Sequence, residues 1–183
     1  MKWSRIPIAV VAAVAGYFAA RGGRGGATVQ DLKHYDLLGI SAELASSPEP
    51  FEIPIPPEAQ GKVLSIENQQ AKRRNFESMV SRMVCAPGIQ ASAEGALNGA
   101  IQNIVTTQKL TLVSQERKPI TLPAASGFRY TAVFRKGSEG LEMQGVILTK
   151  DAKLWQVFSV YLQANSESRE TAARVADSVK LLP

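Results

Sequence analysis

Three alternating segments joined by tight turns constrain the fold of this chain more than any other feature. In Phe128–Arg135, large apolar side chains alternate with polar or smaller ones, which predicts a strand with one buried face and one partly wetted face. Leu141–Thr149 and Leu154–Leu162 follow it as further strands. Only Lys136–Gly140 and Lys150–Lys153 separate the three segments, and connections this short make neighbouring strands antiparallel.

Two amphipathic helices accompany these strands. Ser92 is a good N-cap for the first, and Asn165 or Ser166 for the second. Their apolar side chains recur at helical spacing: Ala93, Ala96, Leu97, Ala100, Ile101, Ile104 and Val105 in the first, and Ala172, Val175, Ala176, Val179 and Leu182 in the second. Earlier strands are predicted at Val63–Gln69, Phe76–Cys85 and Leu110–Gln115. The order predicts an α+β domain with an antiparallel sheet of about six strands flanked by two helices.

This order of elements resembles the Mog1/PsbP-like fold, which includes DcrB-like bacterial envelope proteins. The resemblance is carried by the hairpins GFRYTAVFRKGSEGLEMQGVILTKDAKLWQVFSVYL and by the closing ARVADSVKLL, with its small and aliphatic pair Ser178 and Val179. It covers Gly61 to Pro183 and implies a layered sandwich. Members of this fold mostly act as accessory and assembly factors, so it also implies a role without catalysis. A proline-glycine-tryptophan-like element is common early in domains of that family. This chain departs from the pattern, because no tryptophan follows Pro54–Pro57.

An uninterrupted apolar run, residues 6–20, follows Lys2 and Arg5. As a helix it would reach roughly 22 Å, short of the ~30 Å hydrocarbon core and suited to a signal-peptide core. Cleavage after either alanine that ends the run would place bulky Tyr17 or Phe18 at the third-last position, where a small residue is needed. We therefore favour an uncleaved anchor in the cytoplasmic membrane, with the domain outside the cytoplasm in the cell envelope, over a cleaved and exported form.

Two other interpretations of this leader are weaker. A buried helix of a soluble domain would carry a polar face, and none accompanies the apolar run. A nucleic-acid-binding RGG segment needs several repeats, whereas only two Arg-Gly-Gly units stand in Arg21–Gly26. Four of the 21 basic residues lie in the leader, and the other 17 nearly balance the 16 acidic ones. We expect contact with acidic head groups and no nucleic-acid partner.

Residues 27–60 form a polar and proline-rich stretch between the leader, residues 1–26, and the globular domain, residues 61–183. Five of the ten prolines fall between Pro48 and Pro57. Proline fixes φ and donates no hydrogen bond, so we expect a linker or the beginning of the domain, with edge strands at most. Phe51, Ile53 and Ile55 alternate, which indicates an apolar side laid on the core.

Few side chains in this sequence are typical of catalytic or metal sites. His34, the only histidine, falls in the predicted linker, and Cys85, the only cysteine, falls on a predicted strand. A nucleophile needs a base within hydrogen-bond reach, so we expect both residues to be bystanders. One histidine and one cysteine are too few for a structural zinc site, and the acidic residues show no calcium-loop spacing. We expect no catalytic, cofactor-binding or metal-binding residues.

Two groups of residues are candidates for partner binding: Lys72, Arg73 and Arg74 in a predicted turn over residues 71–75, and Trp155 and Tyr161 on one face of the last strand. A charge run at a turn is usually only solvated, but it also suits an acidic partner or head groups. A strand that is apolar on both faces is typical of a central strand covered on each side, whereas an open face would form a binding groove. We expect Trp155 and Phe158 to be buried on opposite sides of the sheet.

These observations favour a non-enzymatic binding or assembly module whose partner is an envelope protein or a lipid surface. One alternative is a carrier of an apolar or lipid ligand, which would need a cavity between sheet and helix. Another is an enzyme that uses a carboxylate pair, such as Glu142 with Asp151, because such pairs leave no local motif. A pocket with two carboxylates of raised pKa would favour the enzyme.

If the leader is an anchor, the protein should stay with membranes after a carbonate wash, because an apolar helix is held by the hydrocarbon core. The N-terminal sequence of the mature protein should retain Trp3. A soluble form that begins near Ala27 would contradict the anchor and favour the cleaved signal.

Overall fold

The computed structural model describes residues 26–53, 55, 57–122 and 125–183. The apolar run of residues 6–20, predicted as a membrane anchor, lies outside the described residues. Within the described part of the chain, no helix has the length and apolar character needed to span a bilayer.

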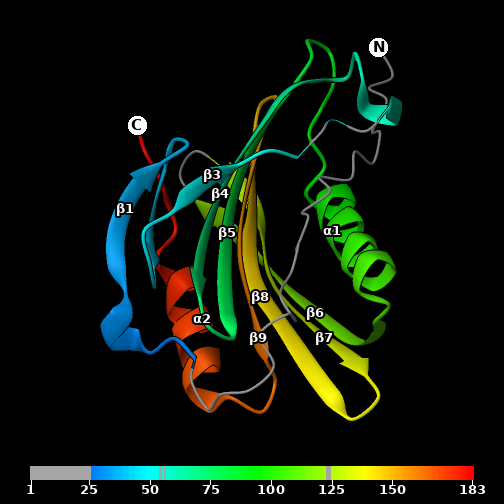
Figure 1. The fold of residues 1–183 in the computed structure, drawn as a ribbon. Helices are drawn as coiled ribbons and strands as arrows, with labels where there is room; N and C mark the ends of the chain where they lie inside the picture. The colour runs from blue at the N-terminus through cyan, green and yellow to red at the C-terminus, as the bar shows by residue number, and fades with distance from the viewer. Residues whose placement is uncertain (1–25, 54, 56, 123–124) are drawn as a thin grey trace.

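A sheet of seven antiparallel strands runs through the middle of the molecule, in the order β3-β4-β5-β9-β8-β7-β6 (Figure 1). Its strands are β3 (Glu49–Phe51), β4 (Val63–Arg73), β5 (Phe76–Cys85), β6 (Thr111–Leu122), β7 (Ala125–Lys136), β8 (Glu139–Lys150) and β9 (Lys153–Leu162). The predicted β7-β8-β9 hairpins are confirmed, since the register pairs Phe134 with Leu141 and Lys150 with Lys153. The antiparallel α+β class is also confirmed, but the strands outnumber the six expected.

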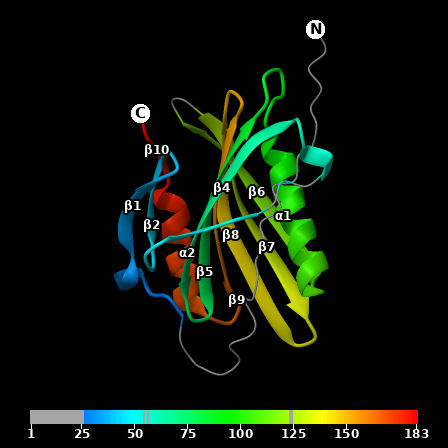
Figure 2. The ribbon, with the colours of Figure 1, turned by 45° about the horizontal axis from the view of Figure 1, so that its top comes forward.

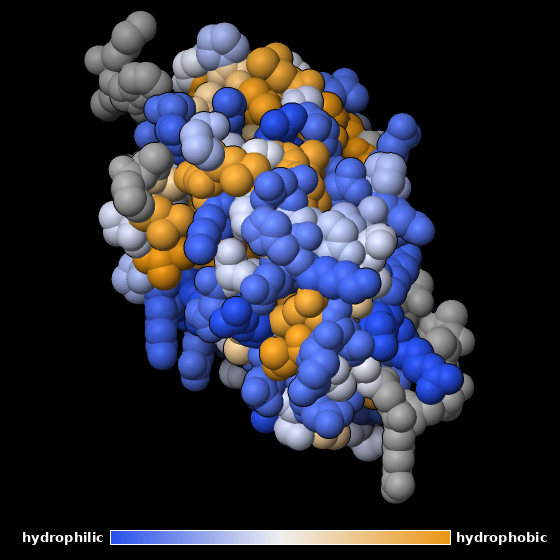
Figure 3. All heavy atoms as spheres, turned by 90° about the vertical axis from the view of Figure 1, so that its left-hand side faces the viewer, coloured by the Kyte–Doolittle hydropathy of each residue, from blue (hydrophilic) through white to orange (hydrophobic). Residues whose placement is uncertain are grey.

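A second, three-stranded sheet has the order β1-β2-β10. It consists of β1 (Lys33–Leu37), β2 (Ile40–Leu44) and β10 (Lys180–Leu181). Residues 27–60, expected as a linker or the beginning of the domain, contribute β1, β2, β3 and the short 3₁₀ helices η1 (Val29–Asp31) and η2 (Pro57–Ala59). Figure 3 shows the side of the molecule that carries the small sheet, where hydrophilic residues surround separate apolar patches.

Two hydrophobic cores lie on opposite faces of the large sheet. Helix α1 (Ala93–Gln108) covers one face, and α2 (Ser166–Ser178) with the small sheet covers the other (Figures 1 and 2). Both predicted caps are confirmed: Ser92 Oγ accepts a hydrogen bond from the Gly95 N–H at 3.1 Å, and Asn165 Oδ1 accepts one from the Ser168 N–H at 2.9 Å. Most residues of the predicted apolar stripes are buried, as their spacing predicts: Ala96, Leu97, Ala100, Ile101 and Ile104 of α1, and Ala172, Val175 and Ala176 of α2. Leu182, predicted on the second stripe, instead lies beyond the end of α2 and is 37% exposed.

Strand β9 belongs to both cores. Its alternation sends Leu154 and Phe158 into the core under α1, and Trp155 and Tyr161 into the core under α2. Phe158 is 1% exposed and Trp155 is 6% exposed, which confirms the prediction that they are buried on opposite sides. A strand buried on both faces is central to its sheet, and β9 lies between β5 and β8.

Two element boundaries differ from the prediction. The turn expected at residues 71–75 is only Arg74 and Asn75, because β4 continues to Arg73, which pairs with Phe76. The strand expected at Leu110–Gln115 runs on to Leu122 through a polar stretch with no alternation. Backbone hydrogen bonds to β7 hold β6 extended, so the length of this strand is set by backbone pairing and not by side-chain burial.

We predict that Phe158→Ala lowers the free energy of unfolding by about 3–5 kcal/mol, because it leaves a cavity in the core under α1. A denaturant titration measures this change. Val113→Ala on β6, where the side chain is 51% exposed, is the control and should stay within about 0.5 kcal/mol of the unmodified protein. A loss under about 1 kcal/mol for Phe158→Ala would contradict its central place in the core.

Candidate functional site

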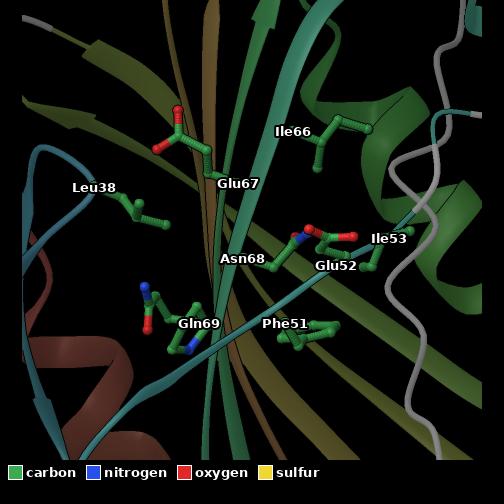
Figure 4. A pocket seen from close by; sticks show the side chains of 9 residues that line it. Leu38, Phe51, Glu52, Ile53, Ile66, Glu67, Asn68 and Gln69 are labelled. Atoms are coloured by element: carbon green, nitrogen blue, oxygen red, sulfur yellow. The ribbon is translucent and has the colours of Figure 1, made fainter.

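A pocket of about 720 Å³ opens beside β4, where β3 leaves the large sheet (Figure 4). It is lined by Leu38, Pro50, Phe51, Glu52, Ile53, Ile66, Glu67, Asn68 and Gln69. The lining combines apolar side chains with two carboxylates and two amides. This mixture of apolar walls and a few polar groups is typical of sites that bind a ligand or a short segment of a partner.

The short pairing of β3 creates this opening. β3 pairs with β4 only from Glu49 opposite Gln70 to Phe51 opposite Asn68. Beyond Phe51 the chain passes across β4, and Ile53 is buried (Figure 4). Residues 63–67 of β4 therefore have no neighbouring strand on this side within the described part of the chain.

Alternation along β4 gives the pocket two different walls. Ile66 and Asn68 lie toward Glu52 and Ile53, whereas Glu67 lies toward Leu38 (Figure 4). The second wall is held in place by two contacts. Arg82 Nη2 donates to Glu67 Oε1 at 2.6 Å, and Trp155 Nε1 donates to the carbonyl oxygen of Leu38 at 2.8 Å.

Asn68 is the buried polar residue of the first wall. It is only 4% exposed, and its side-chain Oδ1 accepts a hydrogen bond from Ser81 Oγ at 2.8 Å. Its Nδ2 has no partner within the described residues. That nitrogen is itself closed off from solvent, so a ligand in the pocket does not reach it, and leaving a buried donor unpaired costs roughly 1–3 kcal/mol. Asn68 therefore shapes this wall, and the exposed carboxylate of Glu52 is the polar group that the wall offers to a ligand.

On the same face of the large sheet as the Asn68 side chain, Gln156 is fully buried, and its Nε2 donates a hydrogen bond to Tyr130 Oη at 3.0 Å. Burial raises the pKa of Tyr130 far above its ordinary range, so its hydroxyl stays protonated. Gln156 Oε1 has no partner among the described residues. The core under α1 thus contains a polar row next to the pocket.

His34 lies on strand β1 and not in a linker, which corrects the placement expected from the sequence. Its Nε2 is 3.0 Å from Asp36 Oδ1 and 3.5 Å from Ser41 Oγ. A Ser-His-Asp triad uses both ring nitrogens, one for the serine and one for the aspartate. Here both contacts involve the same nitrogen, and the His34 side chain is 63% exposed. This group does not have the geometry of a triad.

Cys85 is buried at the end of β5, and burial raises the pKa of its thiol. The reactive thiolate is therefore disfavoured. Across residues 26–53, 55, 57–122 and 125–183, no group of three or more His, Cys, Asp or Glu side chains is placed to hold a metal ion.

Glu142 belongs to a buried hydrogen-bond network and not to the pocket. Tyr161 Oη donates to Glu142 Oε1 at 2.6 Å, and Arg169 Nη2 from α2 donates to Glu142 Oε2 at 3.1 Å. Burial acts to raise the pKa of Glu142, but the hydrogen bonds from Tyr161, Gln144 and Arg169 together bring it below its ordinary value. Asp151 follows the far end of β8, so the structure does not bring Glu142 and Asp151 together.

None of the binding residues predicted from the sequence is among the residues that line the pocket, although Trp155 donates a hydrogen bond to the lining residue Leu38. Lys72, Arg73 and Arg74 are exposed, and Arg73 Nη2 forms an ion pair with Asp31 Oδ1 at 2.8 Å. Trp155 and Tyr161 are buried, so a partner would reach them only if the core under α2 opened. Sequence reasoning found the apolar alternation at Phe51 and Ile53 but missed the pocket.

No protein-family model and no curated protein matches the sequence. Among solved structures, a protein of Bacteroides thetaiotaomicron aligns with a TM-score of 0.38 and 10% identity, over 79% of this chain and 46% of its own. This chain therefore spans less than half of that protein. LpqN of Mycobacterium tuberculosis, a protein involved in cell envelope biogenesis, aligns with a TM-score of 0.37 and 11% identity, over 89% of this chain and 88% of its own. Neither match names the Mog1/PsbP-like fold, and likenesses this low carry no argument about function.

We predict that Glu142→Gln lowers the free energy of unfolding at pH 7 by roughly 1.5–3 kcal/mol, because hydrogen bonds to a charged group are lost. The folded chain lowers the pKa of Glu142, so the carboxylate stabilises the fold above its ordinary pKa of 4.5. This contribution is lost as the pH falls through the folded value. Denaturant titrations from pH 7 downward should show that the free energies of unfolding of the variant and the unmodified protein converge below pH 4.5.

The matched control is Glu94→Gln, which removes an exposed ion pair with Arg117 at 2.9 Å. Exposed pairs contribute little, so its effect should stay within about 1 kcal/mol. A difference for Glu142→Gln that does not change with pH would show that the charge of Glu142 plays no part.

Proposed function

We propose that this protein is a non-enzymatic binding or assembly module of the cell envelope, tethered to the membrane or exported by its leader, and that the pocket beside β4 binds its partner. The observation that carries the proposal is the composition of the pocket. Phe51, Ile53 and Ile66 offer apolar contact, while Glu52 and Gln69 offer polar contact. A partner that meets both sets of groups would be held in one orientation.

The two alternatives have less support. A lipid carrier needs an apolar cavity between sheet and helix, whereas this pocket lies at the edge of β4 and four of its nine lining residues are polar or charged. A carboxylate-pair enzyme needs two acidic groups that act in one site, and Glu142 lies near one end of β8 whereas Asp151 follows the other end. The two carboxylates that line the pocket, Glu52 and Glu67, lie on different walls, and Glu67 is paired with Arg82. Burial raises the pKa of Glu77, but Glu77 does not line the pocket.

Photo-crosslinking in intact envelopes tests the site. A photoreactive amino acid at Gln69, in the pocket, should give a covalent product with the partner. The same group at Gln102, exposed on α1, is the control and should not give that product. Adding Ile66→Ala to the Gln69 protein should reduce the product about tenfold, because it removes a buried apolar contact. Equal products at both positions, or none at Gln69, would overturn the pocket as the partner site.

A further inference from the structure

The open edge of β4 presents backbone groups as well as a pocket. In an antiparallel sheet, consecutive residues direct their backbone groups to alternate neighbours. Pro50 has no N–H and stands opposite Gln69, so the hydrogen-bonded pairs between β3 and β4 are those on either side of it, including Phe51 with Asn68. By this alternation, Ile66 directs its N–H and C=O to the same side of β4, beyond the point where β3 ends.

The other edge of the large sheet is protected against a further strand. Strand β6 has a register shift between Leu112 and Ser114, and it carries Pro119 and two basic residues. Bulges, prolines and charged residues of this kind prevent strand addition at an edge. On β4, residues 63–67 contain neither proline nor a basic residue. A register shift between Val63 and Ser65 confines the regular open edge to residues 65–67.

We infer that the occupant of the pocket is a short extended segment of a partner protein, which adds to β4 as a strand and exchanges two backbone hydrogen bonds with Ile66. This inference rests on the proposed function of the pocket. Successive side chains of the added strand point to opposite faces. The residue opposite Ile66 contacts Ile53, and its two neighbours lie toward Leu38 and Glu67. Leu64, which is 62% exposed, adds an apolar contact at the end of the same edge.

The charges of the lining select a basic segment. Glu52 and Glu67 are the only charged residues in the lining, and Arg82 offsets the charge of Glu67. Glu52 is exposed and forms no ion pair with another described residue. The lining therefore has one unbalanced negative charge, on the same wall as Ile53 and Ile66 (Figure 4). In the antiparallel register, the position two residues before the one opposite Ile66 would fall opposite Asn68, which Phe51 already pairs, so the segment leaves the edge at that point. Glu52 directly follows Phe51, so a lysine or arginine at this exit lies beside its carboxylate, while an apolar residue pairs opposite Ile66.

The probe is a blocked, fluorescent peptide, Thr-Lys-Thr-Val-Thr, titrated against the full-length protein in lipid nanodiscs and followed by anisotropy. The valine should occupy the position opposite Ile66. N-methylation of the valine removes the N–H that pairs with β4 and should weaken binding roughly tenfold or more. N-methylation of the following threonine is the matched control, because that N–H faces away from β4, and binding should stay within about twofold.

The charge requirement has its own pair of variants. Glu52→Gln should weaken binding of the lysine peptide several-fold and reduce the salt dependence of that binding. Glu116→Gln on β6 is the control and should leave both unchanged. Replacing the lysine of the peptide with glutamate should weaken binding more strongly than Glu52→Gln does, because it introduces repulsion. Equal binding of the lysine and glutamate peptides would overturn the selection of a basic segment.

The outcomes separate this inference from the proposed function. Equal binding of both N-methylated peptides would overturn strand addition and leave the pocket as a peptide site. If no peptide binds but the Gln69 crosslink persists, the extended-segment occupant is overturned and the partner site stands. A Gln69 crosslink to a second copy of the chain or to lipid would also overturn a foreign peptide as occupant. Loss of both the crosslink and peptide binding would overturn both proposals.

Discussion

The burial of β9 on both faces is the constraint on which the rest of this structure depends. A strand that sends Phe158 one way and Trp155 the other needs an apolar cover on each side. Helix α1 supplies one cover, and α2 with the small sheet supplies the other. The Trp155 indole also donates to the carbonyl of Leu38, so the loop between β1 and β2 is fixed against the large sheet. That loop is one wall of the pocket.

The pocket exists because β3 is short. β3 pairs with β4 only from Glu49 to Phe51 before the chain passes across the sheet. The uncovered length of β4 then lies between two walls that differ in polarity, because neighbouring side chains of β4 point to opposite faces. A short strand thus leaves an unpaired edge on its neighbour.

The polar network around Glu142 has a different role from the pocket. It links β8, β9 and the first turns of α2 through Tyr161 and Arg169, and its carboxylate is almost enclosed. A buried carboxylate that is fully paired holds its neighbours in one arrangement, but it has little freedom to exchange protons with a substrate. The pocket shows the opposite condition, since Glu52 is exposed and its charge is unbalanced. This contrast is why we place the structural role in the network and the binding role in the pocket.

The sequence by itself determined the elements whose periodicity records burial. Local sequence patterns were enough to predict these elements: the alternation in Phe128–Arg135 and Leu154–Leu162, the apolar stripes of the two helices, and the caps Ser92 and Asn165. The sequence did not determine the length of β6 or the pairing of β1 and β2, because these depend on backbone partners distant in the chain. The sequence also did not predict the pocket, although it showed the alternation of Phe51 and Ile53. Ile66 and Glu52 became candidate binding residues only when tertiary structure placed them beside an unpaired edge, because burial and strand pairing are properties of the assembled fold.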